Sequence, residues 1–325
     1  FAHSVQPASM SLWMIQMLQH HLIIGGVPKA ATTSLFNYLS DHPEVCPANR
    51  KETYFFAREF DREQVCTLPQ TAVSFETYFS HAGPSHQLKM EATPYTLYAA
   101  NSASTIKAML PEATMLFVLR DPTNRLISNF NMQKQRQAPY VKNKTLAMYV
   151  ETEFAKLGKT ERPNNLQLGC YHDYLPPFFE AFGHNKVKVL FFEELTANPT
   201  QTMQTLCMDL GLDPQFFGSY SFNNYNKSVT VRSGTLNKLV LGLEPVVAGV
   251  RSRVMRHPQL YKAFESSVRA GKFALRSVND RGAKKPNATN EPVKAQLQRF
   301  YAPHNAALAE LLQRPLPWQT AVSTQ

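Results

Sequence analysis

The sequence is short of the features that mark a zinc-binding, disulfide-rich or membrane-spanning protein. Four cysteines in 325 residues are scattered along the chain: Cys46, Cys66, Cys170 and Cys207. Because no two of them form a Cys-x-x-Cys pair, a zinc site is not expected. Free thiols in a reducing compartment are the simplest interpretation, and two disulfides are the alternative. No apolar run is long enough to span a membrane.

The N-terminal segment also lacks the pattern of a secretory signal. Polar residues such as Gln16 and Gln19 interrupt the stretch from residue 10 to 26, which makes a poor signal-peptide core. We therefore expect a cytoplasmic protein. A Golgi lumen is the alternative if the chain is a fragment that lacks an N-terminal anchor, and three Asn-x-Ser/Thr triplets would suit a lumen. Residues 1–20 are expected to be a loose lead-in and 21–325 one domain.

The charge is strongly positive, with 34 Lys and Arg against 24 Asp and Glu, a formal net charge of +10. This balance favours a polyanionic ligand or an acidic surface, although it also serves general solubility. Basic residues recur through 233–277, where we expect helices. Such a face is usually solvated, and contact with a polyanion or a membrane surface is the sharper alternative. Aromatic residues are not interleaved with these charges, so no nucleic-acid groove is expected.

The order of apolar and amphipathic segments predicts an α/β domain. Apolar, strand-like runs at 22–24, 113–119 and 186–192 alternate with helical segments, a pattern typical of right-handed crossovers and a central parallel sheet flanked by helices. The C-terminal part is expected to be helical. Predicted helices cover residues 34–42, 74–81, 103–110, 145–157, 172–182, 199–210 and 291–312. Ligands of such sheets bind at the carboxyl ends of the strands.

The stretch His21–Leu35, HLIIGGVPKAATTSL, reads as a strand, a tight turn and the start of a helix. A helix start presents unpaired N–H groups and a partial positive charge, which suit an oxyanion. Lys29 adds a full charge, and hydroxyl groups follow it. The alternative is an ordinary turn with a capping hydroxyl. The Gly-Lys-Ser/Thr ending of the ATP-type phosphate loop is absent.

Two further segments carry candidate chemistry. Arg120 follows the second apolar run, and Pro122 suits the first turn of a helix that would bring Ser128 back toward the ligand of Arg120. Glu52 lies between basic residues and an aromatic block. For this carboxylate, a plain ion pair with Arg50 or Lys51 is the alternative to a catalytic role.

Together these motifs resemble the sulfotransferases that use 3′-phosphoadenosine 5′-phosphosulfate (PAPS), over about residues 20–320. The similarity is closest to the carbohydrate branch that includes heparan sulfate sulfotransferases and bacterial relatives. Lys29-Ala-Ala-Thr-Thr-Ser-Leu resembles the P-loop-like phosphosulfate turn of that family. Leu119-Arg-Asp-Pro, with Arg125 and Ser128, is similar to its 3′-phosphate motif, and Lys51-Glu-Thr-Tyr-Phe-Phe to the segment with its catalytic Glu.

The resemblance implies a role for each motif. Lys29 would stabilise the departing phosphate, and Glu52 would act as general base. The 5′-phosphate would be held by Ala30, Ala31, Thr32, Thr33 and Ser34. Arg120 and Ser128 would hold the 3′-phosphate. The late Gly-Lys-Gly-Arg-like element that holds this phosphate from a second side in the family is not visible here, and Lys227 and Arg232 are the substitutes that the sequence offers. Lys51, Tyr54 and Glu91 would contact the acceptor. PAPS would be the donor and 3′-phosphoadenosine 5′-phosphate (PAP) the product, and the scheme requires no metal.

The sequence departs from the family pattern at three positions. Ala31 replaces a Gly, which is tolerable if its backbone is helical, Tyr54 stands in place of a frequent His, and Ala92 in place of a Lys. PAPS use is therefore better supported than any particular acceptor. The leading hypothesis is sulfuryl transfer to a hydroxyl or amino group of a glycan or glycolipid. The alternatives are a small-molecule or natural-product hydroxyl, a nucleotide kinase with Asp121 on magnesium, and a non-catalytic polyanion-binding protein.

Overall fold

The computed structural model describes residues 20–222 and 290–318, together with the isolated residues 250, 264, 267, 268 and 271. The expected lead-in up to residue 19, Lys227, Arg232 and most of the basic segment 233–277 lie outside the described residues.

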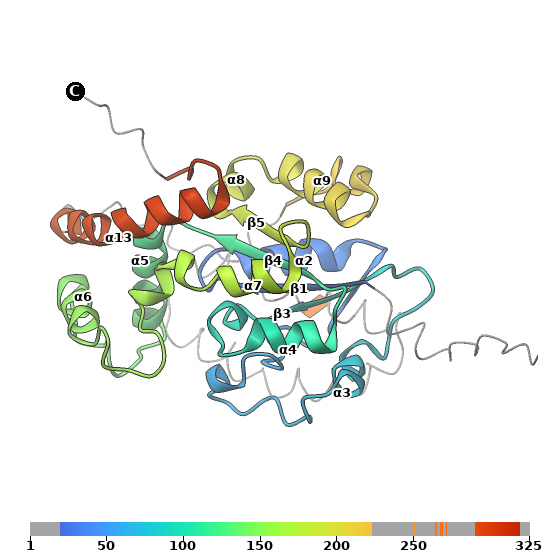
Figure 1. Cartoon of the computed structure of the whole chain (residues 1–325), viewed down its shortest axis with the longest axis horizontal. Coiled ribbons are helices and arrows are strands. Elements are labelled where there is room, and N and C mark those ends of the chain that lie inside the picture. Colours follow the sequence, from blue (N-terminus) through green and yellow to red (C-terminus); the bar gives the residue numbers. More distant parts are fainter. Residues whose placement is uncertain are drawn as a thin grey trace, which may run out of the picture.

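A five-stranded parallel sheet forms the centre of the described chain (Figure 1). Its order is β2-β3-β1-β4-β5, and every neighbouring pair is parallel. The strands are β1 His20–Gly26, β2 Val45–Pro47, β3 Leu88–Ala92, β4 Thr114–Leu119 and β5 Val187–Phe191. This confirms the α/β class and the parallel sheet. The sequence did not predict β2, because a strand of three residues that ends at a proline carries almost no periodic signal.

Strands β1 and β4 are buried on both faces, as their unbroken apolar runs predict. Leu22, Ile23 and Ile24 of β1 are fully buried, and all six residues of β4 are buried. Gly25 makes this packing possible, because a Cβ there would lie 2.6 Å from the ring of Phe117. The same ring packs edge-on against Phe178 of α7 (Pro176–Phe182), which seats that helix on the sheet.

Helices flank the sheet (Figure 1). Besides α7 they are α2 Thr32–Asp41, α3 Ala72–Glu76, α4 Ser102–Met109, α5 Pro122–Gln135, α6 Leu146–Ala155, α8 Phe192–Ala197, α9 Pro199–Leu210 and α13 Glu291–Leu312. The predicted bounds of α9 and α13 are confirmed. The helix expected at 172–182 is divided into a 3₁₀ turn, Tyr171–Asp173, and α7, because the two prolines at its start supply no N–H to a preceding turn.

A second apolar cluster joins α5, α6 and α13 beside the sheet. Tyr301 of α13 is fully buried there, and its hydroxyl donates to the Leu166 carbonyl over 2.9 Å. Gly169 lets the ring approach closely, because a Cβ at that position would lie 2.7 Å from Tyr301 Cε1. The C-terminal helix is thereby fixed against the chain that precedes α7.

All four cysteines are free thiols, and three of them are buried. Within the described ranges, no helix combines the length and the apolar character needed to cross a membrane.

Candidate active site

The turn between β1 and α2 leaves the start of α2 open to an anion. Ala31 is the N-cap residue and supplies no side-chain hydrogen bond to the helix, so another acceptor is needed for the first N–H groups. Thr33 and Ser34 follow it at the wall of a cleft, beside Lys29. This arrangement favours the anion cradle over a turn capped by its own hydroxyl.

Two of the residues expected in this cradle differ from expectation. Ala30 is fully buried, and its N–H already donates to the Val27 carbonyl over 3.2 Å, so it is no phosphate donor. Ala31 has φ 63° and ψ 20°, which is a left-handed rather than a right-handed helical backbone. The expectation that an alanine could replace the family's glycine here without strain, which required a helical backbone, is therefore wrong. Lys29 is left-handed too, with φ 76°. The turn therefore holds its shape against the preference of two side chains.

Ala31→Gly is expected to stabilise the protein. A left-handed alanine costs about 1–2 kcal/mol, while the extra freedom of glycine in the unfolded chain costs about 0.5–1 kcal/mol. The net gain of about 0.5–1 kcal/mol would appear in urea titration as a higher midpoint with an unchanged slope. Ala30→Gly is the matched control and should destabilise. Equal destabilisation by the two variants would contradict the strain at Ala31.

Arg120, directly after β4, links that strand end to the β1–α2 turn. Its Nη1 donates to the Lys29 carbonyl over 2.9 Å, and its guanidinium lies 4.2 Å from the centre of the Phe192 ring. The Tyr171 hydroxyl donates to the Arg120 carbonyl over 2.8 Å. Ser128, on α5, lines the same cleft. The structure thus brings together both predicted phosphate motifs at neighbouring strand ends.

Glu52 lines the cleft, and its backbone is hydrogen-bonded to the last residue of β3. Its N–H donates to the Ala92 carbonyl over 2.9 Å. The carboxylate accepts hydrogen bonds from Lys51 Nζ at 2.6 Å and the Tyr54 hydroxyl at 3.3 Å. Burial by itself raises the pKa of Glu52, but the charge of Lys51 and these hydrogen bonds outweigh it and hold the pKa below its usual range. Glu52 therefore forms the ion pair with Lys51 and also lines the cleft, and its carboxylate is ionised at neutral pH.

Glu91 does not face the cleft, which corrects the expected acceptor contact. It is 1% exposed, and its carboxyl group accepts from Thr53 Oγ1 at 2.8 Å and Thr93 Oγ1 at 2.5 Å. Thr93 in turn accepts the N–H of Tyr54 over 3.1 Å. Glu91 therefore supports the turn that carries Glu52 and Tyr54 from behind.

The cleft itself has a volume of about 1240 Å³ and is rich in cations. Eight basic side chains line it among the described residues: Lys29, Arg50, Lys51, Arg62, Arg120, Arg136, Lys156 and Arg162. Four carboxylates oppose them: Glu52, Asp61, Glu63 and Glu153. The excess of positive charge will concentrate an anionic ligand there.

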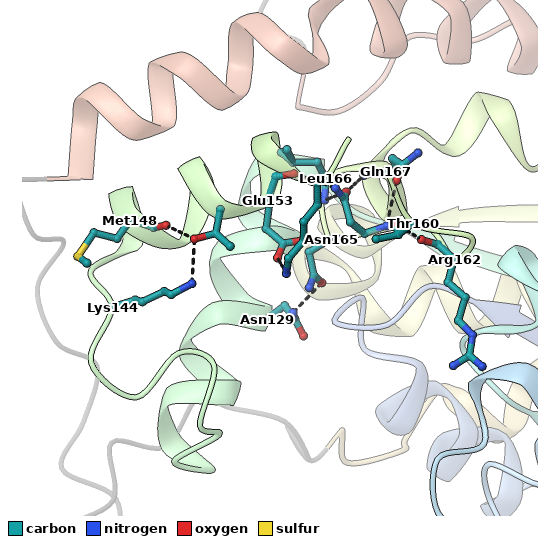
Figure 2. A network of polar contacts seen from close by, with 12 residues as sticks. Asn129, Lys144, Met148, Glu153, Thr160, Arg162, Asn165, Leu166 and Gln167 are labelled. Atoms are coloured by element: carbon teal, nitrogen blue, oxygen red, sulfur yellow. Dashed lines mark hydrogen bonds and ion pairs between the residues drawn. The ribbon is translucent and has the colours of Figure 1, made fainter. Parts of the chain in front are cut away.

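One wall of the cleft is built by a polar network around Asn165 (Figure 2). Asn165 N–H donates to the Glu153 carboxylate over 2.8 Å, and its side-chain oxygen accepts from Asn129 Nδ2 over 2.7 Å. Arg125, which is fully buried, donates to the Asn165 carbonyl. Arg125 thus anchors α5 to this wall rather than reaching a ligand. The wall carries Arg162, whose carbonyl accepts from Thr160.

Sequence reasoning missed three residues that contact the phosphate motifs. Met132 Sδ lies 3.4 Å from Lys29 Nζ, and its position four residues after Ser128 on one helix face is a signal that could have found it. Phe192 directly follows β5 and so stands at a strand end beside Arg120. No local pattern points to Tyr171.

Comparison with known proteins places the chain in a family. The model of the sulfotransferase domain matches residues 19–238. Heparan sulfate glucosamine 3-O-sulfotransferase 3B1 of Mus musculus is 24% identical over 214 residues, covering 63% of this chain and 49% of that protein. Membrane-associated sulfotransferase kil1 of Dictyostelium discoideum is 30% identical over 115 residues, covering 35% and 23%. The chain thus spans about half the length, or less, of these two relatives.

Among solved structures, a sulfotransferase from Alicyclobacillus acidocaldarius superposes with a TM-score of 0.61 at 19% identity, covering 91% of this chain and 96% of that one. This likeness supports the fold. Because the domain model matches more than half of the chain, the protein belongs to the sulfotransferase family.

Proposed function

We propose that this protein transfers the sulfuryl group of PAPS to a hydroxyl or amino group of an acidic glycan or glycolipid. The observation that carries the proposal is the 2.9 Å hydrogen bond from Arg120 to the Lys29 carbonyl, within one cleft that also contains the ionised Glu52. This hydrogen bond connects the guanidinium group of Arg120 to the turn that precedes the uncapped N-terminus of α2. The ligand that suits this pair is a nucleotide with two separated phosphate groups.

The residues present fit such a donor. The start of α2 has no side-chain cap at Ala31, and Arg120 Nε is buried without a partner in the part of the chain that the structure describes. The amides and hydroxyls at the start of α2 would hold the 5′-phosphosulfate. Arg120 and Ser128 would hold the 3′-phosphate, whose recognition suits a planar, permanently charged guanidinium.

Transfer then needs positioning and charge stabilisation more than covalent chemistry. Glu52 takes the proton of the acceptor hydroxyl while that oxygen attacks sulfur. The bond from sulfur to the bridging oxygen breaks, and Lys29 stabilises the charge that develops on the departing phosphate. Lys51 holds Glu52 in its ionised form, and Tyr54, which donates to the same carboxylate, helps to orient it.

The charge of the cleft favours an acidic acceptor. Arg62, Arg136 and Arg162 line it in addition to the residues assigned to the donor, and they come from three different segments of the chain. Relatives that are named as heparan sulfate glucosamine sulfotransferases agree with this choice.

A kinase that binds magnesium through Asp121 is less favoured. Asp121 is the N-cap of α5, where Oδ1 accepts from the Thr123 N–H at 3.0 Å and Oδ2 from Asn124 Nδ2 at 2.6 Å. The carboxylate therefore already has a structural role at the helix start.

Transfer of labelled sulfate from PAPS to an acidic and a neutral glycan tests the proposal. We expect the acidic acceptor to be preferred, and Arg162→Gln to raise its KM by up to about fivefold, because Arg162 is exposed and one exposed ionic contact contributes at most about 1 kcal/mol. Arg299→Gln, at an exposed position on α13, is the matched control and should leave KM unchanged. No transfer to either glycan, or equal use of the two, would contradict the assigned acceptor class.

The Lys29 ammonium group predicts a pH dependence of nucleotide binding. Burial, and then the charges of Arg120 and Arg136, lower the pKa of Lys29 to about 8. The side chain is charged below this pH and loses its proton above it. PAP affinity should therefore fall by up to about tenfold between pH 7 and pH 9, since one pH unit above the pKa leaves about a tenth of the groups charged.

Calorimetric titration at the two pH values, in buffers of different ionisation enthalpy, measures this effect. At pH 9 binding should take up a proton, because the bound phosphate restores the charge of Lys29. In Lys29→Met, binding should be weak and take up no proton. Proton uptake that persists in this variant would assign the titration to another group.

A further inference from the structure

We propose that Cys170, Asp173 and His304 form a binding site for a transition-metal dication, with Zn²⁺ as the ion that suits the donors best. Each residue offers one ligand atom, and these atoms all lie within 4.8 Å of one another. A thiolate, a carboxylate and an imidazole are the three side-chain ligand types of zinc in proteins. Three such ligands leave a fourth position for water. None of the three residues lines the cleft, so this site does not depend on the proposed sulfuryl transfer.

The chain brings these donors together through a local turn. Cys170 ends the 3₁₀ turn Gln167–Gly169, and Asp173 ends the next one, Tyr171–Asp173. The Asp173 N–H donates to the Cys170 carbonyl over 3.1 Å, which closes the turn between them. Two ligands three residues apart are thereby fixed on one side of the segment.

The third donor comes from α13, more than a hundred residues later. His304 lies three residues after Tyr301, and residues at this spacing share a helix face. Tyr301 packs into the space beside Gly169 and bonds to the Leu166 carbonyl over 2.9 Å. The packing therefore fixes His304 relative to Cys170 through buried groups rather than through a surface loop.

His172 adds the outer support that ligating carboxylates usually have. Its Nε2 lies 3.0 Å from Asp173 Oδ1, and its ring lies 5.1 Å from the ring of His304, measured between centres. Its Nδ1 is buried and has no partner among the described residues. An imidazole in this position orients the carboxylate, as the second layer of groups around metal sites does.

Binding would exchange a proton for the metal. The S–H bond of Cys170 breaks, the sulfur–metal bond forms, and the proton is released to water. The metal would then join α13 to the segment that contains Tyr171, whose hydroxyl holds the Arg120 carbonyl. Its role would be to stabilise the fold behind the cleft.

Titration of the chelator-treated, full-length protein with Co²⁺ tests the proposal by absorbance. We expect one equivalent of Co²⁺ to produce a thiolate-to-cobalt charge-transfer band, which Zn²⁺ then removes. The band should vanish in Cys170→Ser, and Co²⁺ affinity should fall by about tenfold or more in His304→Gln. Cys66→Ser, at a partly exposed thiol outside the proposed site, should retain both the band and the affinity.

Circular dichroism of each variant shows whether the fold is intact. If Cys170→Ser does not fold, Asp173→Asn at a half-exposed position replaces it and should weaken Co²⁺ binding by a similar factor. Zn²⁺ should also raise the Tm of the wild type but not of the variants that have lost a ligand. Absence of the band in the wild type, or a band that remains in Cys170→Ser, would overturn the proposal.

Discussion

Glu52→Gln will reduce the rate of sulfuryl transfer by at least about 10²–10⁴-fold, the usual contribution of a positioned general base. Glutamine has the same size and still accepts a hydrogen bond from Lys51, but it cannot take the acceptor proton. The affinity for PAP should change by no more than a few-fold, because Glu52 is assigned to the acceptor and not to the nucleotide. Single-turnover transfer of labelled sulfate, beside calorimetric titration with PAP, measures the two quantities separately.

Glu63→Gln is the matched control, since Glu63 is a second carboxylate of the same cleft. It should keep nearly all of the activity. The wild-type rate should also hold down to acidic pH, because Lys51 keeps the pKa of Glu52 below its usual range and the base stays ionised until the pH falls through that value. Near-normal turnover in Glu52→Gln would remove Glu52 from the role of base.

Arg120→Ala will remove the preference for a nucleotide with a 3′-phosphate. Hydrogen bonds between charged groups contribute about 1.5–3 kcal/mol each, so loss of the guanidinium should lower PAP affinity by about 10²-fold. Arg120 also holds the Lys29 carbonyl, and its loss will loosen the turn that binds the 5′ group. Adenosine 5′-monophosphate should therefore bind somewhat more weakly as well.

The ratio of the PAP and adenosine 5′-monophosphate affinities separates the two effects. A loosened turn weakens both nucleotides alike, whereas a lost 3′-phosphate contact changes the ratio. Arg120→Lys should give an intermediate ratio, because an ammonium keeps the charge without the two-pronged geometry. A wild type without preference, or a ratio that Arg120→Ala leaves intact, would break the assignment of Arg120 and Ser128.

The sequence predicts the elements whose signals are local. An unbroken apolar run identifies β4, and a run interrupted by Lys188 identifies β5. A proline at the start, together with a left-handed residue after the end, defines α9, where Gly211 has φ 71°. The turn after β1 and Arg120 after β4 could be placed in one site, because parallel strands end at one edge of the sheet.

The sequence could not assign the direction in which a side chain points. Glu91 lies in a strand buried on both faces, and only the tertiary packing turns its carboxyl group toward Thr53 and Thr93 instead of the cleft. The prediction that Ala30 would hold the 5′-phosphate is wrong for a related reason, since its N–H already donates to the Val27 carbonyl within the turn. Likewise, the sequence around Cys170 contains no metal-binding motif, because His304, the other nitrogen or sulfur ligand of the proposed metal site, comes from a helix distant in the chain.

The bond from Arg120 to the Lys29 carbonyl has a thermodynamic meaning beyond its place in the site. In the proposed complex, one guanidinium would bind one anion and also stabilise the backbone that binds the other, which would link the two ends of a nucleotide. Coupling between two sites is reciprocal: an anion bound at the start of α2 would strengthen anion binding by Arg120 by the same free energy as an anion bound to Arg120 would strengthen binding at the start of α2. A donor with both phosphates therefore gains from cooperativity that neither half would show when bound alone.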